Sequence, residues 1–476
     1  MEYVVHIGLE THVQLNTRTK IWCGCPNTFG HEPNTQVCPV CLGYPGAMPV
    51  LNREAVKLTV LSGLMLGCDI NRTSKFDRKS YFYPDMPKNY QISQYDQPLC
   101  LGGQVPILVQ GESKIVRLTR IHLEEDVGKN NHFEHSSGVD FNRAGTPLME
   151  IVSEPDMSSA DEAVAYLQAL KQILVYGGVS ECNLEQGNLR CDINCSVRPA
   201  TQQELGVKTE IKNMNTFKGV HRSLTYEIAR QVEILRAGGV IVQETRRWDD
   251  EAGMTRSMRT KEDAHDYRYF PEPDLTPVVL TDEQISAWRD ALPELPAKRR
   301  ERFISQYGLP EYDAGVLVAD KAVADYFEAV VAACGEPKET SNWIMTEVLR
   351  ALAEKEMDIA AIRITPRALA DLIALVTGGA INRTAAKTVF QLMFDEGGDP
   401  KTIVEEKGLA QVSDTGELET WVREAIASNP KSAEDYRAGK KAALQFLMGQ
   451  VMRMSKGKAN PPVVLAMLAE QLDAGD

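Results

Sequence analysis

The chain has 476 residues, of which 43% are hydrophobic and 25% charged, an ordinary balance for a globular protein of about two to four domains. Its net charge of −14 argues against non-specific adhesion to nucleic acid, although it is compatible with a local basic face. No apolar run approaches ~20 residues, and the N-terminus carries no basic leader or Arg-rich transit peptide. We therefore expect a cytoplasmic protein with no membrane partner, whose ten cysteines are thiols or metal ligands rather than disulfides.

Residues 4–15 alternate between apolar and polar side chains, the pattern of a half-buried strand. Glu10 and His12 fall on the polar face, about 7 Å apart along the strand. A carboxylate and an imidazole on one face can form half of a cation site. An exposed polar strand face is the alternative, and this pattern alone favours it.

Four cysteines follow in two short-spaced pairs, Cys23 with Cys25 and Cys38 with Cys41, separated by a twelve-residue loop-like segment. This spacing is typical of structural zinc, and four sulfur ligands leave no open coordination position for catalysis. We expect a Zn²⁺ that braces the loop. His31 is a weaker ligand candidate, and four free thiols in a turn-rich segment are the alternative.

Residues 52–67 have the pattern of a helix that ends near Gly67. Residues 74–98 are dense in aromatic, basic and proline residues and are predicted to form a loop. Such a loop, with Lys79 and Lys88, could hold phosphate or stack a base, or it could be an aromatic-packed surface loop. Residues 105–123 predict a hairpin that turns at 110–112.

A cluster of acids lies between residues 121 and 151. Glu124, Glu125 and Asp126 are adjacent, and Glu150 lies in an apolar run that makes it an improbable free surface charge. Carboxylate oxygens suit Mg²⁺. Because clustered carboxylates repel one another, a bound cation or simple solvation would explain them, and the spacing does not choose between these.

Residues 159–177 predict an amphipathic helix, and residues 188–198 alternate as a strand whose polar face carries Arg190 and Asp192. The next segment places Lys212 on a similar face. Such a mixed polar face is either exposed to solvent or forms one wall of a cavity that binds a charged ligand. In a cavity, these side chains would suit a phosphate group that is bound through a metal ion. Residues 216–239 predict a helix, and residues 244–274 an irregular, Arg-rich region.

From about residue 295 the sequence predicts an almost entirely helical region, divided near residue 405. The helical periodicity covers residues 312–333, 339–357, 366–378, 381–395, 417–427, 434–452 and 461–472. The last part is basic, through side chains that include Lys440, Lys441, Arg453, Lys456 and Lys458. They could bind RNA phosphates, although a solvated helix face is the more common explanation.

Several motifs are absent from the sequence. There is no Gly-x-x-x-x-Gly-Lys-Ser/Thr loop, no Gly-x-Gly-x-x-Gly, and no evident Ser or Cys–His nucleophile arrangement. If ATP is used, its phosphates must be held by a metal and the sheet. If ammonia is used, it must be released elsewhere.

Several segments occur together, in the order found in one known family. Residues 7–13, 74–98, 139–151 and 189–194 resemble the motifs of the B subunits of tRNA-dependent amidotransferases, and the likeness extends through the helical tail. The resemblance implies an α+β fold. Residues 1–294 would form an antiparallel-sheet cradle similar to glutamine synthetase and guanidino kinases, 295–405 a helical domain and 406–476 a helical tRNA-binding tail.

The resemblance also implies an activity and its cofactors. The family is a glutamine-hydrolysing ligase that uses ATP to phosphorylate the side-chain carboxylate of Asp-tRNA(Asn) or Glu-tRNA(Gln), which ammonia then converts to the amide. Mg²⁺ would lie on Glu10, His12, Glu125 and Glu150. Lys79, Lys88, Arg190, Asp192 and Lys212 are weaker candidates for phosphate contacts or for the walls of an ammonia channel.

The implied partners are a glutaminase A subunit, a C subunit and tRNA(Asn) or tRNA(Gln). Four cysteines at the zinc position occur in only some family members, so zinc cannot be essential to the shared chemistry. The alternative function is a tRNA-binding scaffold subunit that leaves phosphorylation to another chain.

Overall fold

The structure is a computed structural model that describes residues 2–184, 186–260, 267–411, 415–455 and 457–474. The chain forms two compact units, Met1–Pro296 and Ala297–Asp476. Within these described ranges, no helix has the length and apolar character needed to cross a membrane.

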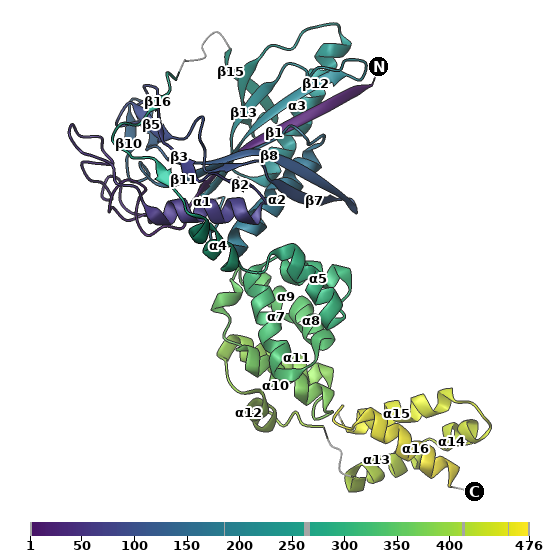
Figure 1. Ribbon diagram of the computed structural model, residues 1–476. Helices are drawn as coiled ribbons and strands as arrows, with labels where there is room; N and C mark the ends of the chain where they lie inside the picture. Colours follow the sequence, from purple (N-terminus) through teal and green to yellow (C-terminus); the bar gives the residue numbers. More distant parts are fainter. Residues whose placement is uncertain (1, 185, 261–266, 412–414, 456, 475–476) are drawn as a thin grey trace. The chain divides into compact units, whose positions relative to one another are not determined.

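The first unit is built on a ten-stranded sheet with the order β15-β14-β13-β12-β1-β11-β8-β6-β2, in which β7 also pairs with β8 (Figure 1). Its central strands are β12 (Leu189–Pro199), β1 (Tyr3–Gln14), β11 (Pro147–Ser153) and β8 (Glu112–Glu125). These four pair antiparallel, as expected, whereas β13 (Thr209–Met214) and β14 (Glu244–Asp249) pair parallel. The sheet is therefore mixed, and the α+β class is confirmed.

The remaining strands of this unit are short or lie at its edges. They are β2 (Asp69–Ile70), β3 (Thr73–Ser74), β4 (Asp77–Ser80), β5 (Tyr90–Ser93), β6 (Cys100–Leu101), β7 (Gln104–Val109), β9 (Lys129–His132), β10 (Ser137–Asp140), β15 (Met254–Thr260), β16 (Phe270–Pro271) and β17 (Val278–Val279). The predicted hairpin is confirmed as β7 and β8, whose turn residues Gln110 and Gly111 both have positive φ, as a two-residue turn of this hand requires.

Two segments predicted to lack regular structure contain strands. Strands β4 and β5 lie within residues 74–98 and form a three-stranded sheet with β16, while β14 and β15 form a hairpin at the edge of the large sheet. The prediction was wrong there because these strands are short or charged and have little local strand signal. Pairing with distant residues stabilises them, and local propensity does not report such pairing.

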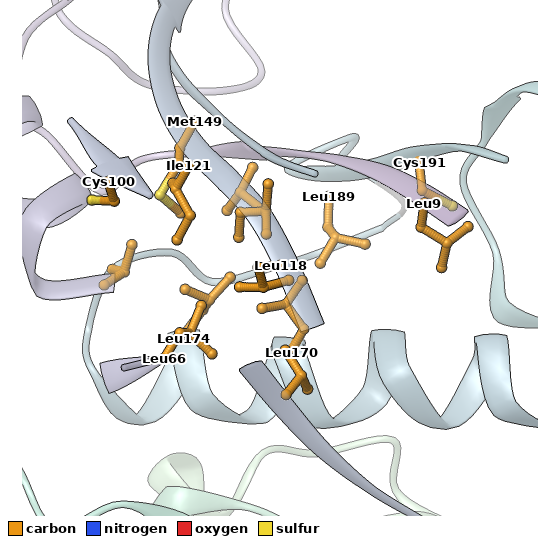
Figure 2. Packing of buried hydrophobic residues seen from close by; sticks show 14 of the residues in the cluster. Leu9, Leu66, Cys100, Leu118, Ile121, Met149, Leu170, Leu174, Leu189 and Cys191 are labelled. Carbon is orange, nitrogen blue, oxygen red and sulfur yellow. The ribbon is translucent and has the colours of Figure 1, made fainter. Parts of the chain in front are cut away.

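Helices cover the apolar face of the sheet. The predicted helices are confirmed as α1 (Arg53–Met65), α2 (Ala160–Tyr176) and α3 (Phe217–Arg236), whose N-caps are Asn52, Ser159 and Thr216. A further helix, α4 (Asp282–Asp290), was not predicted. In Figure 2, Leu170 and Leu174 of α2 point toward the strand that carries Leu118 and Ile121. Because one face of the sheet is used for this core, the opposite polar face remains for a site.

The second unit is helical, as predicted. Its elements are α5 (Pro296–Tyr307), α6 (Glu311–Val318), α7 (Lys321–Cys334), α8 (Pro337–Trp343), the π-helix η2 (Ile344–Val348), α9 (Leu349–Glu354), the 3₁₀ turn η3 (Ile359–Ala361), α10 (Pro366–Thr377), α11 (Arg383–Glu396), α12 (Pro400–Glu406), α13 (Thr415–Ser428), α14 (Pro430–Arg437), α15 (Ala442–Met454) and α16 (Pro461–Asp473). Two predicted helices are each divided in two. Asp320 caps α7 after α6, and Gly439, with φ of 90°, lies between α14 and α15.

Candidate functional site

Four strands of the large sheet each contribute one side chain to a single row on its polar face. Arg190 of β12 pairs with His12 of β1, His12 pairs with Glu150 of β11, and Glu150 pairs with His122 of β8. Directly paired residues project to the same face, so the register brings together residues that are far apart in the sequence.

The two central residues of this row, His12 and Glu150, form a compact cluster with Glu124, and the candidate ligand atoms of all three lie within 4.8 Å of one another. We call it the imidazole–carboxylate cluster. Oε2 of Glu150 is 3.4 Å from Nε2 of His12 and 3.5 Å from Nε2 of His122. Both carboxylates are buried, with Glu124 2% and Glu150 8% exposed, so the solvated-acid alternative does not hold.

The charges in this cluster stabilise one another. Burial by itself lowers the pKa of His12, but the hydrogen bond and charge of Glu150 outweigh it and raise the pKa to about 9. Burial conversely opposes ionisation of Glu150 and Glu124, yet His122 and neighbouring cations hold the pKa of both carboxyls below the usual value. Two buried carboxylates and a partly buried imidazole form a donor set that would suit a hard divalent cation.

A second cluster, the three-carboxylate cluster, lies beside the first on the same face. It consists of Glu10, Asp192 and Glu210, whose candidate ligand oxygens lie within 4.8 Å of one another. Nζ of Lys212 is 2.7 Å from Asp192 and 2.8 Å from Glu210. Glu10 lies two residues before His12 on β1, so the alternation of one strand links the two clusters.

The four residues predicted to share one Mg²⁺ do not lie together. His12 and Glu150 are in one cluster and Glu10 is in the other. Glu125 belongs to neither, because its carboxylate accepts hydrogen bonds from Nζ of Lys88 at 2.5 and 2.6 Å and from the backbone N–H of Ile92 at 2.8 Å. Neighbouring residues of a strand face opposite sides, so Glu124 rather than Glu125 projects toward Glu150.

The predicted Mg²⁺ ligands did not include Glu124 or Glu210, which belong to these clusters, or His122, which lies beside Glu150. Strand alternation could have identified two of them, since His122 and Glu124 share a face of β8. The pattern of residues 208–212 already placed Glu210 on the face of Lys212, but nothing in the sequence indicated that this face meets Glu10.

Asp126 anchors one end of the polar face. Its carboxylate accepts hydrogen bonds from Arg190 at 2.8 Å and from Gln14 at 2.9 Å, and Arg143 lies 3.6 Å away. Burial disfavours its charge, but Arg190 and Arg143 outweigh this effect and lower the pKa of the carboxyl to about 2. Arg190 is therefore held by Asp126 in the row that contains His12.

A cavity of about 600 Å³ opens beside Asp126. Its lining includes Gln14, Arg143 and Arg190, and also Phe29, Gly30 and His31 of the cysteine-containing loop. Of the weaker candidates, Arg190 thus faces this cavity, Lys88 binds Glu125, and Asp192 and Lys212 belong to the three-carboxylate cluster. Lys79 of β4 has its ammonium 4.9 Å from the ring centre of Tyr267.

The four predicted zinc ligands lie together. The Sγ atoms of Cys23, Cys25, Cys38 and Cys41 are all within 4.8 Å of one another, so this cluster could hold a metal such as zinc. A hydrogen bond with Cys23 lowers the pKa of Cys41 to about 4 and raises that of Cys23, as expected of thiols that share a site. His31 is exposed, hydrogen-bonds Thr28 at 2.9 Å and takes no part.

Of the described basic residues predicted to bind RNA, Arg453 lies in α15, whereas Lys440, Lys441 and Lys458 lie in the turns that adjoin it. Lys440, Lys441, Arg453 and Lys458 are exposed, and Lys440 pairs with Asp435 at 2.9 Å. Lys456 lies outside the described residues. A small apolar cluster that includes Leu418, Val422, Leu447 and Leu468 supports this region.

Fold and site together define a two-unit α+β protein with two acidic clusters on a sheet face and one four-thiol cluster in a loop. The chain belongs to the GatB/GatE family: residues 5–286 match the family described as "GatB/GatE catalytic domain", and residues 325–472 match "GatB domain". The resemblance noted from the sequence motifs is thereby confirmed.

Full-length relatives agree with this assignment. The chain is 55% identical to a protein of Caldanaerobacter subterraneus subsp. tengcongensis and 53% identical to one of Caldicellulosiruptor saccharolyticus, with 99% of this chain and 100% of each relative covered. It is also 53% identical to a protein of Geotalea daltonii, with the same coverage. Each of the three is named as the B subunit of aspartyl/glutamyl-tRNA(Asn/Gln) amidotransferase.

Proposed function

We propose that this chain is the subunit of a tRNA-dependent amidotransferase that activates the substrate carboxylate with ATP. The substrate is the aspartyl or glutamyl group of Asp-tRNA(Asn) or Glu-tRNA(Gln), as the names of the relatives suggest. The observation that carries the proposal is the row of His12, Glu150 and His122, which with Glu124 forms a buried, charged cluster on the sheet. A scaffold subunit would have no need for such a cluster.

The reaction divides into two balanced steps. A carboxylate is a poor acyl donor because its leaving group would be oxide. One of its oxygens therefore attacks the γ-phosphorus of ATP, the bond to the β-phosphate oxygen breaks, and ADP leaves. Ammonia then attacks the acyl carbon of the acyl phosphate, inorganic phosphate leaves with the bonding electrons, and the nitrogen loses a proton to give the amide.

The polar face supplies what the first step needs. The donor sets of the two acidic clusters fit Mg²⁺, which when bound would neutralise charge on the phosphoryl oxygens. His12 must lose its proton to serve as a ligand, and neighbouring acids hold that proton in the metal-free cluster. Lys212 and Arg190 border the clusters with fixed positive charge, which favours the binding of phosphate groups.

The proposed partners are a glutaminase A subunit, which supplies ammonia, and a C subunit, in a heterotrimer. The relatives are named as one subunit of an amidotransferase, which supports such an assembly. The absence of a recognisable nucleophile motif from the sequence is in keeping with ammonia release by another chain. Residues 406–476 are proposed to bind the tRNA through their exposed Lys and Arg side chains.

The test is Glu150→Gln, which keeps the shape of the side chain and removes its charge. In the assembled complex, with misacylated tRNA and ammonium chloride as nitrogen donor, we expect ATP cleavage to fall by about 10²–10³-fold. Glu134→Gln is the matched control, because Glu134 is 89% exposed and lies outside both clusters. Unchanged tRNA-dependent ATP cleavage in Glu150→Gln would assign phosphorylation to another subunit and favour the scaffold function.

A further inference from the structure

Lys79 of β4 stands out among the cations near the two acidic clusters because, within the described part of the chain, its side chain makes no hydrogen bond or ion pair. Lys88 binds Glu125, Lys212 binds Asp192, and Arg190 binds Asp126. Nζ of Lys79 instead lies over the ring of Tyr267, 4.9 Å from its centre. Strand β5 pairs with the strand of Lys79 and reaches the cluster, because the hydroxyl of its Ser93 donates to Oε2 of Glu124 at 3.0 Å. Burial by itself lowers the pKa of Lys79, but the charges of Glu124 and Glu150 outweigh it and raise the pKa.

Tyr267 is held against the strand that carries Lys79. The backbone carbonyl of Tyr267 accepts a hydrogen bond of 2.9 Å from the N–H of Ser80, the residue after Lys79. Its ring packs edge-on against Tyr81 and against Tyr269, each with ring centres 6.1 Å apart. Backbone and ring therefore fix the same side chain from two directions.

The chain after Tyr267 is fastened to the same strand. Arg78 binds Glu272 through two hydrogen bonds of 2.7 and 2.8 Å, and the N–H of Glu272 donates to the carbonyl of Phe76 at 2.9 Å. The ring of Tyr269 stacks on Tyr95 at 4.3 Å. We call residues 267–272 the tyrosine strap. Arg268 within it has φ of 42°, a conformation that non-glycine residues adopt only when their surroundings enforce it.

We propose that Tyr267 is a positioning residue that holds the ammonium of Lys79 beside the imidazole–carboxylate cluster. An aromatic face attracts a cation without using its N–H groups. All three N–H donors of Lys79 thus stay available to bind an anionic oxygen. The carboxylates of the cluster cannot bind such an oxygen directly, because both groups are negatively charged. The oxygen to be bound is one of the transferring phosphoryl group, so this inference rests on the proposed function.

The decisive comparison is between Tyr267→Leu, which loses the ring, and Tyr267→Phe, which keeps it. In the full complex with misacylated tRNA, Tyr267→Leu should lower kcat for ATP cleavage about tenfold and leave the KM for ATP nearly unchanged. Tyr267→Phe should stay within about twofold of the unmodified protein, since the ring face is retained. Tyr226→Leu, which removes a tyrosine that packs on Trp248 in the same unit, is the matched control.

A double-mutant cycle separates positioning from a structural role. Lys79→Ala should lower kcat at least as much as Tyr267→Leu, and the pair should be little worse than Lys79→Ala alone. A readout independent of turnover is the acetylation of Lys79 in the nucleotide-free complex, which should be faster in Tyr267→Leu because the ring no longer covers Nζ. If Tyr267→Leu does not fold, Tyr267→Met, which fills a similar length without a ring, takes its place.

Two outcomes would overturn the inference and are distinct from failure of the proposed function. Equal kcat in Tyr267→Leu and the unmodified protein would show that the ring does not act on the reaction. Additive losses in the double mutant would show that Tyr267 acts independently of Lys79. If the proposed function itself were wrong, the Glu150→Gln complex would cleave ATP as fast as the unmodified complex.

Discussion

The two kinds of candidate metal site in this protein are built in opposite ways. The four cysteines come from one loop of nineteen residues, from Cys23 to Cys41, and short spacing alone brings their sulfur atoms together. The imidazole–carboxylate cluster draws His12, Glu124 and Glu150 from three strands, and only the register of the sheet makes them neighbours. The comparison teaches that a local site can be read from spacing, whereas a sheet site depends on which strands pair.

The largest expected effect tests whether the metal ligand of the sheet site is Glu124, as the strand register indicates, or Glu125, as the sequence motif implied. Glu124→Gln should abolish Mn²⁺ binding at the imidazole–carboxylate cluster and lower tRNA-dependent ATP cleavage by about 10²–10³-fold, because Glu124 faces Glu150. Glu125→Gln should leave Mn²⁺ binding in place, because its partner is Lys88. Calorimetry with Mn²⁺ and an ATP-cleavage assay measure both. Loss of Mn²⁺ binding in Glu125→Gln but not in Glu124→Gln would instead identify Glu125 as the ligand.

The second prediction concerns the support of the sheet site. Asp126→Asn removes a buried carboxylate charge and leaves the partly buried Arg190 without its charged partner, so the free energy of unfolding of the first unit should fall by about 3 kcal/mol at pH 7. Chemical denaturation measures this loss. Asp282→Asn, which removes an exposed partner of Arg72, is the control and should change stability little.

The pH dependence of Asp126→Asn gives a further check. The folded-state pKa of Asp126, about 2, is depressed below its unfolded value of about 3.9, so its stabilising effect is present above the unfolded pKa. It is lost as the pH falls from about 4 through 2. Stability of the variant should therefore depend less on pH in this window. If the free energy of unfolding changed equally with pH in the variant and the parent protein, the stabilising effect assigned to the Arg190–Asp126 pair would be contradicted.

The cysteine site should behave differently from the sheet site. The unmodified protein should contain about one equivalent of zinc, and the double change Cys38→Ser and Cys41→Ser should remove it. ATP cleavage should stay within about twofold, because four sulfur ligands leave no position for a substrate. Cys182→Ala, at a buried cysteine outside the cluster, is the control and should retain zinc. Metal analysis that found no zinc in the parent would reject the site.

The smallest effect is expected in the tail. Lys441→Ala or Lys458→Ala should weaken tRNA binding a few-fold and reduce its salt dependence by about one phosphate contact each. Fluorescence anisotropy at several salt concentrations measures both quantities. Lys321→Ala, which removes a lysine of the second unit that pairs with Asp325, is the control. Identical salt dependence in all variants would count against a tRNA-binding tail.

The sequence alone indicated the helical second half and the strand from residues 4 to 15, and the resemblance of its motifs implied the α+β class. It also determined the zinc-type spacing and the membership indicated by motifs 7–13 and 139–151. The helices and the strand could be predicted from periodicity, because a strand or helix that buries one face must repeat its apolar residues at a fixed interval. His12 and Glu10 could be placed on one face for that reason.

Tertiary structure alone decided which acids meet. Strands β1, β8, β11 and β12 are separated by long stretches of chain, and their pairing sets His12 opposite Glu150 and Arg190. A shift of one residue in register would exchange Glu124 for Glu125, because alternate side chains project to opposite faces of a strand. Register is fixed by the core on the far side of the sheet, so the ligands of the sheet site follow from packing and not from their own spacing.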